Sequence, residues 1–238
     1  MKKIWITGGG SGIGKALALR LREDKNEVFI SGRTEEKLKS VGWGTTPIVC
    51  DITDRSSVDA AVEKIGDIDL AILNAGTYAP GPTTETSMDD FKSAMEVNYF
   101  GTLNCLQALL PLMRKNGGHI VVVASLAGYI GLPNSSGYGP SKAAVISLCE
   151  SIRAELHNTD VKFQMVSPGF VKSPLTEKNN FKMPHLIKAD EAAEKIIQGL
   201  ESKAFEIAFP APFVRQMKFL RLLPYKLYFP LINKVTTQ

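Results

Sequence analysis

The chain has few residues of the kinds that build disulfide frameworks or metal sites. Its 238 residues include three cysteines and three histidines. No two cysteines have the C-x-x-C spacing, so we expect buried, reduced thiols of a cytoplasmic protein. The histidines are scattered along the chain, which disfavours a metal site. The first apolar stretch is short and interrupted by glycines, which disfavours a signal peptide or a membrane span there.

Short apolar runs alternate with helical patterns along most of the chain. The runs predict strands near 3–7, 27–31, 47–50, 69–74, 119–125, 161–167 and 205–209. Helical patterns lie near 13–24, 54–65, 88–115, 138–158 and 189–201. Such alternation predicts an α/β fold, with a parallel sheet covered by helices on both faces. The chain is 44% hydrophobic, which suffices for one sizeable core.

The first predicted strand leads directly into a glycine-rich turn, and a helical pattern follows the turn. Glycines let a backbone turn sharply and approach a pyrophosphate closely. The N-terminus of the following helix presents unpaired N–H groups and a partial positive charge to phosphates. We therefore expect a dinucleotide-binding site, formed here by Gly8, Gly10, Ser11, Gly12, Ile13 and Gly14.

Three polar residues further along are suited to proton exchange with a carbonyl or alcohol oxygen. Tyr138 and Lys142 are four residues apart, so they share one face of a helix. Ser125 follows an apolar run, where a strand ends and a pocket can open. A nearby cation lowers the pKa of a phenol from its usual value of about 10, so we expect Lys142 to lower the pKa of Tyr138. For the Y-x-x-x-K pattern alone, an ordinary exposed helix face is the alternative.

The second predicted strand ends beside a basic residue instead of an acidic one. An acidic residue near this point accepts a hydrogen bond from the ribose of NAD, whereas a guanidinium binds the 2′-phosphate of NADP. Arg33 stands here, and Thr34 offers a further hydroxyl. The sequence therefore favours NADP(H) over NAD(H). The alternative is that Arg33 is a solvated loop residue.

These motifs occur in one order along the chain: Thr7-Gly8, Gly12, Gly14, Asn74-Ala75-Gly76, Asn98, Ser125, Tyr138, Lys142 and Pro168-Gly169. The ordered set resembles the short-chain dehydrogenase/reductase family in its compact single-domain form. The resemblance covers about residues 2–209. It implies a Rossmann-like, doubly wound and mostly parallel seven-stranded sheet with helices on both faces, in a catalytic domain of residues 1–209.

The resemblance also implies roles for the polar residues. Tyr138 would be the general acid in reduction, or the base in oxidation. Lys142 would lower the pKa of Tyr138 and bind the nicotinamide ribose. Ser125 would hold and polarise the substrate oxygen. Asn98 would support a chain of water molecules that connects Lys142 to solvent.

Further cofactor contacts follow from the same resemblance. They are Asp51 and Ile52 at the adenine, Asn74, Ala75 and Gly76 beside the cofactor, and Pro168, Gly169, Val171 and Ser173 near the carboxamide. Residues 173–188, which include Asn180, would form a lid over the substrate. Four residues are candidates to line an apolar substrate pocket: Tyr78, Leu126, Ala127 and Tyr129.

Residues 210–238 form a basic and apolar C-terminal tail. They contain five basic residues and no acid, whereas the whole chain has a net charge of +4, so the remainder carries −1. Pro224 and Pro230 are expected to divide the tail and to exclude a continuous membrane span. We expect the tail to dock on the domain's own core or on a sister subunit. The alternatives are that the tail lines a substrate pocket, or that it makes peripheral contact with an anionic membrane. The main domain has no basic face, so we expect no nucleic-acid partner.

The sequence thus predicts an NADP(H)-dependent oxidoreductase that interconverts a ketone or aldehyde and an alcohol. Two alternatives stay open: a non-catalytic NADP-binding sensor or scaffold, and a reductase that acts on lipid at a membrane surface. In the family, the helices carrying Asn98 and Tyr138 commonly join subunits, which suggests a homodimer or homotetramer.

Overall fold

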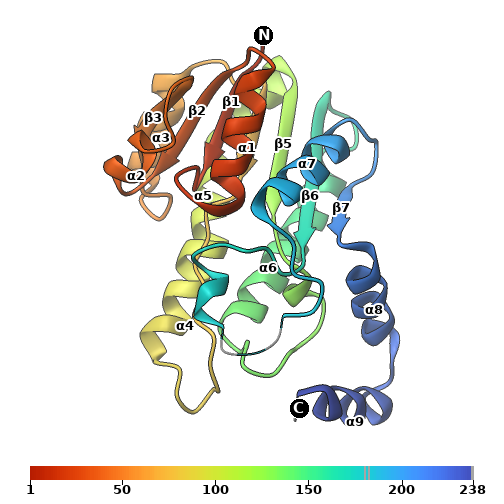
Figure 1. Ribbon diagram of the computed structural model, residues 1–238. Helices are drawn as coiled ribbons and strands as arrows, with labels where there is room; N and C mark the ends of the chain where they lie inside the picture. The colour runs from red at the N-terminus through yellow and green to blue at the C-terminus, as the bar shows by residue number, and fades with distance from the viewer. Residues whose placement is uncertain (180, 182, 237–238) are drawn as a thin grey trace.

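A seven-stranded, entirely parallel sheet forms the centre of the molecule (Figure 1). The computed structural model describes residues 1–179, 181 and 183–236. The strands are β1 (Lys3–Thr7), β2 (Glu27–Gly32), β3 (Thr45–Val49), β4 (Leu70–Leu73), β5 (Gly118–Val123), β6 (Val161–Pro168) and β7 (Glu206–Phe209). Their order is β3-β2-β1-β4-β5-β6-β7. Strands β2 and β3 are added on one side of β1 and the later strands on the other side, so the topological switch point lies between β1 and β4. In such doubly wound sheets, ligands bind at the carboxyl ends of the strands beside this switch point.

Helices cover both faces of the sheet (Figure 1). One face carries α1 (Gly12–Glu23), α2 (Glu35–Lys39) and α7 (Ala189–Leu200), and the other carries α3 (Arg55–Ile65), α5 (Gly101–Asn116) and α6 (Tyr138–Glu155). Beyond the carboxyl ends of the strands lie α4 (Met88–Met95), η1 (Glu96–Phe100), η2 (Leu126–Gly128), η3 (Thr176–Lys178), α8 (Ala211–Leu222) and α9 (Tyr225–Thr236). The predicted α/β fold is confirmed.

The core consists of two apolar layers, one on each face of the sheet. Successive side chains of a strand point to opposite faces, so β1 sends Ile4 and Ile6 into one layer and Trp5 into the other. All three are at most 1% exposed. Burial on both faces explains why the strands read as continuous apolar runs, and why their predicted ends agree with the structure within two residues.

The helix predicted over 88–115 is not continuous. Helix α4 ends at Met95, η1 is one turn of π-helix, and α5 begins at Gly101. A Cβ on Gly101 would lie 2.7 Å from the side chain of Ile52, so the glycine allows close packing where the helix resumes. The π turn holds Asn98, which is fully buried. Single π turns inside helices are frequent at functional sites.

The C-terminal tail folds into α8 and α9, which extend from β7 past the ends of the strands (Figure 1). The favoured docking on the domain's own core is confirmed for Phe213 and Met217, which join the core layer on the α6 side. Pro224 separates the two helices as predicted, but Pro230 lies inside α9, so its predicted break is wrong. None of the helices in the described part of the chain is long and apolar enough to cross a membrane.

Candidate active site

The structure brings Ser125, Tyr138 and Lys142 together where β5 ends. Ser125 caps η2, and its hydroxyl accepts a hydrogen bond from the N–H of Ala127 at 3.1 Å. Tyr138 is the first residue of α6, and Lys142 lies one turn later. Helix η2 packs directly on α6, because a Cβ on Gly128 would lie only 2.7 Å from the carbonyl carbon of Lys142. This contact places the serine hydroxyl beside the phenol.

The environment of Tyr138 favours the neutral phenol. Burial raises its pKa to about 12, a hydrogen bond with Ser125 opposes that shift, and Tyr78 adds to it. The predicted lowering of this pKa by Lys142 is therefore wrong for the protein alone. The physical reason is the position of the ammonium: Nζ donates to the carbonyl of Val123 at 2.8 Å and lies 5.9 Å from the centroid of the Tyr138 ring.

Lys142 is itself enclosed by the ends of β4 and β5. Only 5% of the residue is exposed, and burial lowers the pKa of its ammonium to about 8. Gly76 lies directly beside it, since a Cβ there would be 3.7 Å from Nζ and 3.0 Å from the amide oxygen of Asn98. A buried lysine with one carbonyl partner has donors left for a ligand, because an ammonium carries three.

Asn98 joins the loop after β4 to helix α6. Its side-chain oxygen accepts from the N–H of Thr77 at 2.8 Å, and its amide donates to the carbonyl of Thr77 at 3.1 Å and to Ser141 Oγ at 2.9 Å. The sequence analysis did not single out Thr77 or Ser141. The only feature of the sequence that points to them is their position: Thr77 follows Gly76, and Ser141 precedes Lys142. The role of Asn98 in a water chain stays a prediction.

Tyr78 connects the Tyr138 pocket to the lid. Its ring meets the ring of Tyr138 edge-on, with centroids 4.8 Å apart, and its hydroxyl donates to Asn179 Oδ1 at 2.7 Å. Asn179 belongs to the predicted lid, of which Asn180 and Lys182 lie outside the described residues. The structure thus supports Tyr78 as a residue that lines the pocket.

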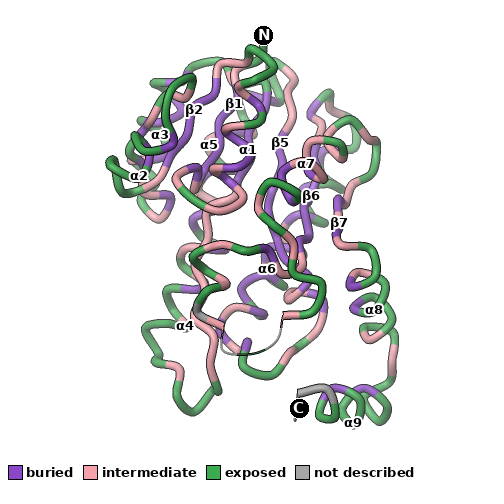
Figure 2. Tube along the Cα trace, in the orientation of Figure 1, coloured by how far each residue is buried: buried purple, intermediate pink, exposed green. Residues whose placement is uncertain are grey.

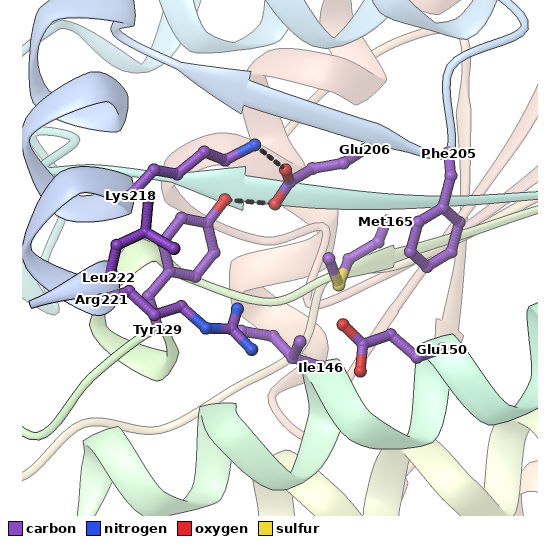
Figure 3. A pocket seen from close by; sticks show the side chains of 9 residues that line it. All are labelled: Tyr129, Ile146, Glu150, Met165, Phe205, Glu206, Lys218, Arg221 and Leu222. Atoms are coloured by element: carbon purple, nitrogen blue, oxygen red, sulfur yellow. Dashed lines mark hydrogen bonds and ion pairs between the residues drawn. The ribbon is translucent and has the colours of Figure 1, made fainter.

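Tyr129 points away from this site, although the sequence placed it among the pocket residues. It contributes to a separate hollow of about 360 Å³ between α6, β6, β7 and α8 (Figure 3). There its hydroxyl donates to Glu206, which also accepts from Ser167 at 2.8 Å and from Lys218 at 2.7 Å. Burial alone would raise the pKa of Glu206, but these hydrogen bonds outweigh burial and lower it. The carboxylate therefore ties α8 to the sheet.

The glycine-rich turn is built for close approach. Gly8 has φ +66°, and a Cβ on Gly14 would lie 2.3 Å from the carbonyl oxygen of Gly8. Ser11 takes the N-cap position of α1, and no side-chain capping bond is recorded for it within the described residues. The first-turn N–H groups therefore remain available to an anion. With Gly10 and Ile13 completing the turn, these residues fit a phosphate-bearing cofactor.

The lid begins next to this turn. A Cβ on Gly12 would lie 3.1 Å from Cβ of Ser173. A hollow of about 320 Å³ opens between them, with Lys15 and Lys172 on its wall. Glu177 and Asp190 also line it, so the charged side chains on its wall balance.

The end of β4 is tied to β1 at the switch point. The Thr7 hydroxyl accepts from the N–H groups of Asn74 and Ala75 at 3.0 and 3.1 Å. The Asn74 amide donates back to the carbonyls of Thr7 and Gly8, at 3.1 and 3.3 Å. The Asn-Ala-Gly turn is therefore held against the glycine-rich turn, and its contact with the cofactor stays a prediction.

Three polar residues surround the far end of the glycine-rich turn. Arg33 is exposed where β2 ends, and Thr34 is the N-cap of α2. A Cβ on Gly10 would lie 3.4 Å from Cβ of Lys37, so Lys37 is a second cation beside the turn. The sequence analysis missed Lys37, because the short helix α2 was not predicted. The neighbouring acid Glu35 is held by Lys39 at 2.7 Å.

The remaining predicted contacts also lie at the carboxyl ends of strands. Asp51 follows β3, and its Oδ1 accepts from the N–H and hydroxyl of Thr53, at 3.0 and 2.8 Å. Ile52 is buried against Gly101. Pro168 ends β6, the Gly169 N–H donates to the Phe209 carbonyl at 2.8 Å, and Val171 pairs with Ile187 in the lid.

Comparison with known proteins identifies the family. The family model described as short chain dehydrogenase matches residues 2–184, and the chain belongs to that family. It is an NAD(P)-dependent oxidoreductase of this class. An uncharacterized oxidoreductase from Myxococcus xanthus is 33% identical, over 94% of this chain and 93% of its own.

Solved structures share the fold over nearly the whole chain. A short chain dehydrogenase from Burkholderia cenocepacia, in complex with NADP, has a TM-score of 0.87 and 30% identity and covers 97% of both chains. A short chain dehydrogenase/reductase from Burkholderia phymatum, in complex with NAD, has a TM-score of 0.82 and 23% identity and covers 91% of this chain and 92% of its own. At that lower identity the likeness concerns the fold alone.

Proposed function

We propose that this protein interconverts a carbonyl compound and an alcohol with NADP(H), using Tyr138 as the general acid or base. The observation that carries the proposal is the convergence of the Tyr138 phenol, the Ser125 hydroxyl and the buried Lys142 ammonium at the end of β5. Proton transfer by a positioned side chain contributes about 10²–10⁴-fold to such reactions.

Each residue has one task in this mechanism. Ser125 holds the substrate oxygen by a hydrogen bond. Tyr138 is protonated at neutral pH, since its pKa is about 12, and it gives its proton to that oxygen during reduction. Lys142 stabilises the phenolate that remains, through its positive charge. A bound nicotinamide supplies the hydride. A phenol with a high pKa is a ready proton donor only when a cation stabilises its conjugate base, which explains why Lys142 is buried close by.

The preference for NADP(H) rests on the cations beside the glycine-rich turn. Arg33 is exposed and Lys37 lies next to Gly10, which supports a role for both in binding a 2′-phosphate. Thr34 adds a hydroxyl at the start of α2. The NADP complex of the Burkholderia cenocepacia relative supports this preference.

An apolar substrate is proposed from the side chains around the lid. Tyr78 lies against Tyr138, and Phe181 of the lid packs on Phe170 with ring centroids 5.8 Å apart. We also propose a homodimer or homotetramer, supported by exposed Phe100 and Leu112 on the π turn and α5. A cytoplasmic location is supported by the free, buried cysteines.

A panel of carbonyl substrates followed by NADPH absorbance tests the proposal. The panel runs from small aldehydes to long-chain keto-lipids, with NADH in parallel. We expect protein-dependent oxidation of NADPH with at least one apolar carbonyl, and slower oxidation of NADH. Tight NADPH binding without turnover of any carbonyl or alcohol would instead support the sensor alternative.

A further inference from the structure

Much of α8 and α9 is exposed (Figure 2), and large apolar side chains are concentrated there. Within the described part of the chain, six of the fifteen large exposed apolar residues lie on them: Phe219, Leu222, Tyr225, Leu227, Phe229 and Leu231. We call this set, with the basic residues between its members, the tail surface. Leu222 is 82% exposed and Tyr225 is 73% exposed. Large apolar side chains that are exposed together on neighbouring helices point to a site of interaction.

The inner faces of both helices are already occupied. Phe213 and Met217 of α8 are buried in the core, and Lys218 is bonded to Glu206 of β7. On α9, Tyr228 is 3% exposed and its hydroxyl donates to the carbonyl of Gly131. The two helices are therefore anchored in place, and their outer faces are left for a partner.

The charges between the apolar residues identify the kind of partner. Residues 210–238 hold five basic residues and no acid. Lys218 is paired with Glu206, but no ion pair is recorded for Arg215, Lys226 or Lys234 among the described residues. Cations next to large apolar side chains suit an interface with anionic headgroups above and acyl chains below. We propose that the tail surface docks on an anionic lipid membrane.

A second copy of the chain fits this surface less well. The commonest homodimer contact is isologous, so it would bring the same basic residues of two tails together. Like charges in contact oppose association, and this tail has no acid to offset them. An anionic surface removes that repulsion and covers the same apolar side chains.

The buried face of α8 contacts the lid of the candidate active site. Phe213 of α8 stacks on Phe170 with ring centroids 5.6 Å apart, and Phe170 meets Phe181 of the lid. His185 of the lid lies 6.3 Å from the ring of Phe213. The docking itself does not depend on the proposed reaction.

Flotation of the full-length protein with lipid vesicles tests the proposal. Vesicles of phosphatidylcholine alone are compared with vesicles that also contain phosphatidylglycerol, from about 0.02 M to about 0.5 M salt. We expect binding to the anionic vesicles at low salt, at least ~10-fold weaker at high salt, and little binding to the neutral ones. If the protein did not bind anionic vesicles at low salt, the proposal would be overturned. That would hold even if the tail surface proved to bind a second copy of the chain or an acidic protein.

Paired substitutions show whether the tail surface is responsible. The double substitution Leu222→Ser with Leu227→Ser, and separately Arg215→Gln with Lys226→Gln, should each weaken anionic vesicle binding at least ~10-fold. The matched control, Met88→Ser with Lys92→Gln, changes exposed residues of α4 and should bind like the wild type. All these residues are exposed, so thermal melting should be unchanged. Equal binding by the tail variants and the control would overturn the proposal.

Discussion

Tyr138 and Lys142 are both held in an environment that favours their neutral forms. Burial raises the pKa of the phenol to about 12 and lowers the pKa of the ammonium to about 8. A charge that is buried without an opposite charge is unfavourable, so the phenol keeps its proton at neutral pH, whereas the lysine, with its pKa of about 8, is less basic than usual but still mostly protonated. Transfer of a proton to substrate makes the phenolate, and the neighbouring ammonium then gains an opposite charge. This coupling makes the pair suited to reversible acid–base work.

Arg33→Ala should change the choice of cofactor. The side chain is exposed, so folding should be unaffected, while a charge-assisted hydrogen bond to a 2′-phosphate is lost. We expect the Kd for NADPH to rise at least ~10-fold and the Kd for NADH to change by less than about 2-fold. Fluorescence titration with both cofactors measures this. Arg153→Ala, on the exposed face of α6, is the control. Equal loss for NADPH and NADH would remove Arg33 from 2′-phosphate binding.

Residues of the site differ in how far the sequence predicts them. Tyr138, Lys142 and Ser125 carry distinctive chemistry at fixed spacing, so a pattern finds them. Lys37 and Ser141 reach the site only because the chain is folded. Lys37 lies on a helix that was not predicted, and Ser141 accepts a hydrogen bond from Asn98, which is 43 positions away in the chain. Common residue types without a motif leave no signal in a single sequence.

Helix α1 depends on a close contact at its first turn. Gly14→Ala would place a Cβ 2.3 Å from the carbonyl oxygen of Gly8, so the glycine-rich turn must shift. We expect a loss of about 1–3 kcal/mol in the free energy of unfolding, measured with urea. The Kd for NADPH should also rise at least ~10-fold, because the shift would displace the N–H groups that we propose to bind the phosphates.

Gly131→Ala is the matched control for that substitution. Nothing lies within 4 Å of a Cβ added at Gly131, so both the unfolding free energy and the Kd should stay near the wild-type values. If Gly14→Ala behaved like Gly131→Ala, the tight turn would not be required for cofactor binding.

At the level of elements, the strands were predictable and some helices were not. A strand buried on both faces is an apolar run, and the five inner strands repeat that signal, whereas the edge strands β3 and β7 are only partly buried. Helix α2 has only five residues, too few to show a period. The π turn at Asn98 does not interrupt the helical pattern of the sequence, so that pattern predicts one continuous helix. Pro230 predicts a break in the tail, but α9 continues through it.

For the whole molecule, the histidine on β5 predicts how stability changes in acid. His119 is half-buried beside Gln164, and burial, together with Lys162, lowers its pKa to about 4, although an interaction with the Gln164 side chain opposes the shift. The unfolded chain binds the proton near the usual pKa of about 6.5. Between these values the unfolded state holds more protons, so stability is full above about pH 6.5 and falls as the pH falls toward 4.

His119→Asn should therefore remove part of that acid sensitivity. We expect the loss of unfolding free energy between pH 6.5 and 4 to be smaller than in the wild type, by on the order of 2–3 kcal/mol. Urea unfolding across this pH range measures the difference. His157→Asn, an exposed residue after α6, should leave the wild-type slope unchanged. Parallel slopes for all three proteins would show that His119 is not buried in its neutral form.

The central claim is that the Tyr138 hydroxyl exchanges a proton with the substrate oxygen. The most direct measurement is the turnover of Tyr138→Phe on a carbonyl that the wild type reduces, together with its Kd for NADPH. The substitution removes one oxygen and preserves the ring that packs on Tyr78. We predict that kcat falls at least ~10²-fold while the Kd for NADPH stays within about 2-fold. A variant that turns over as fast as the wild type would contradict this mechanism.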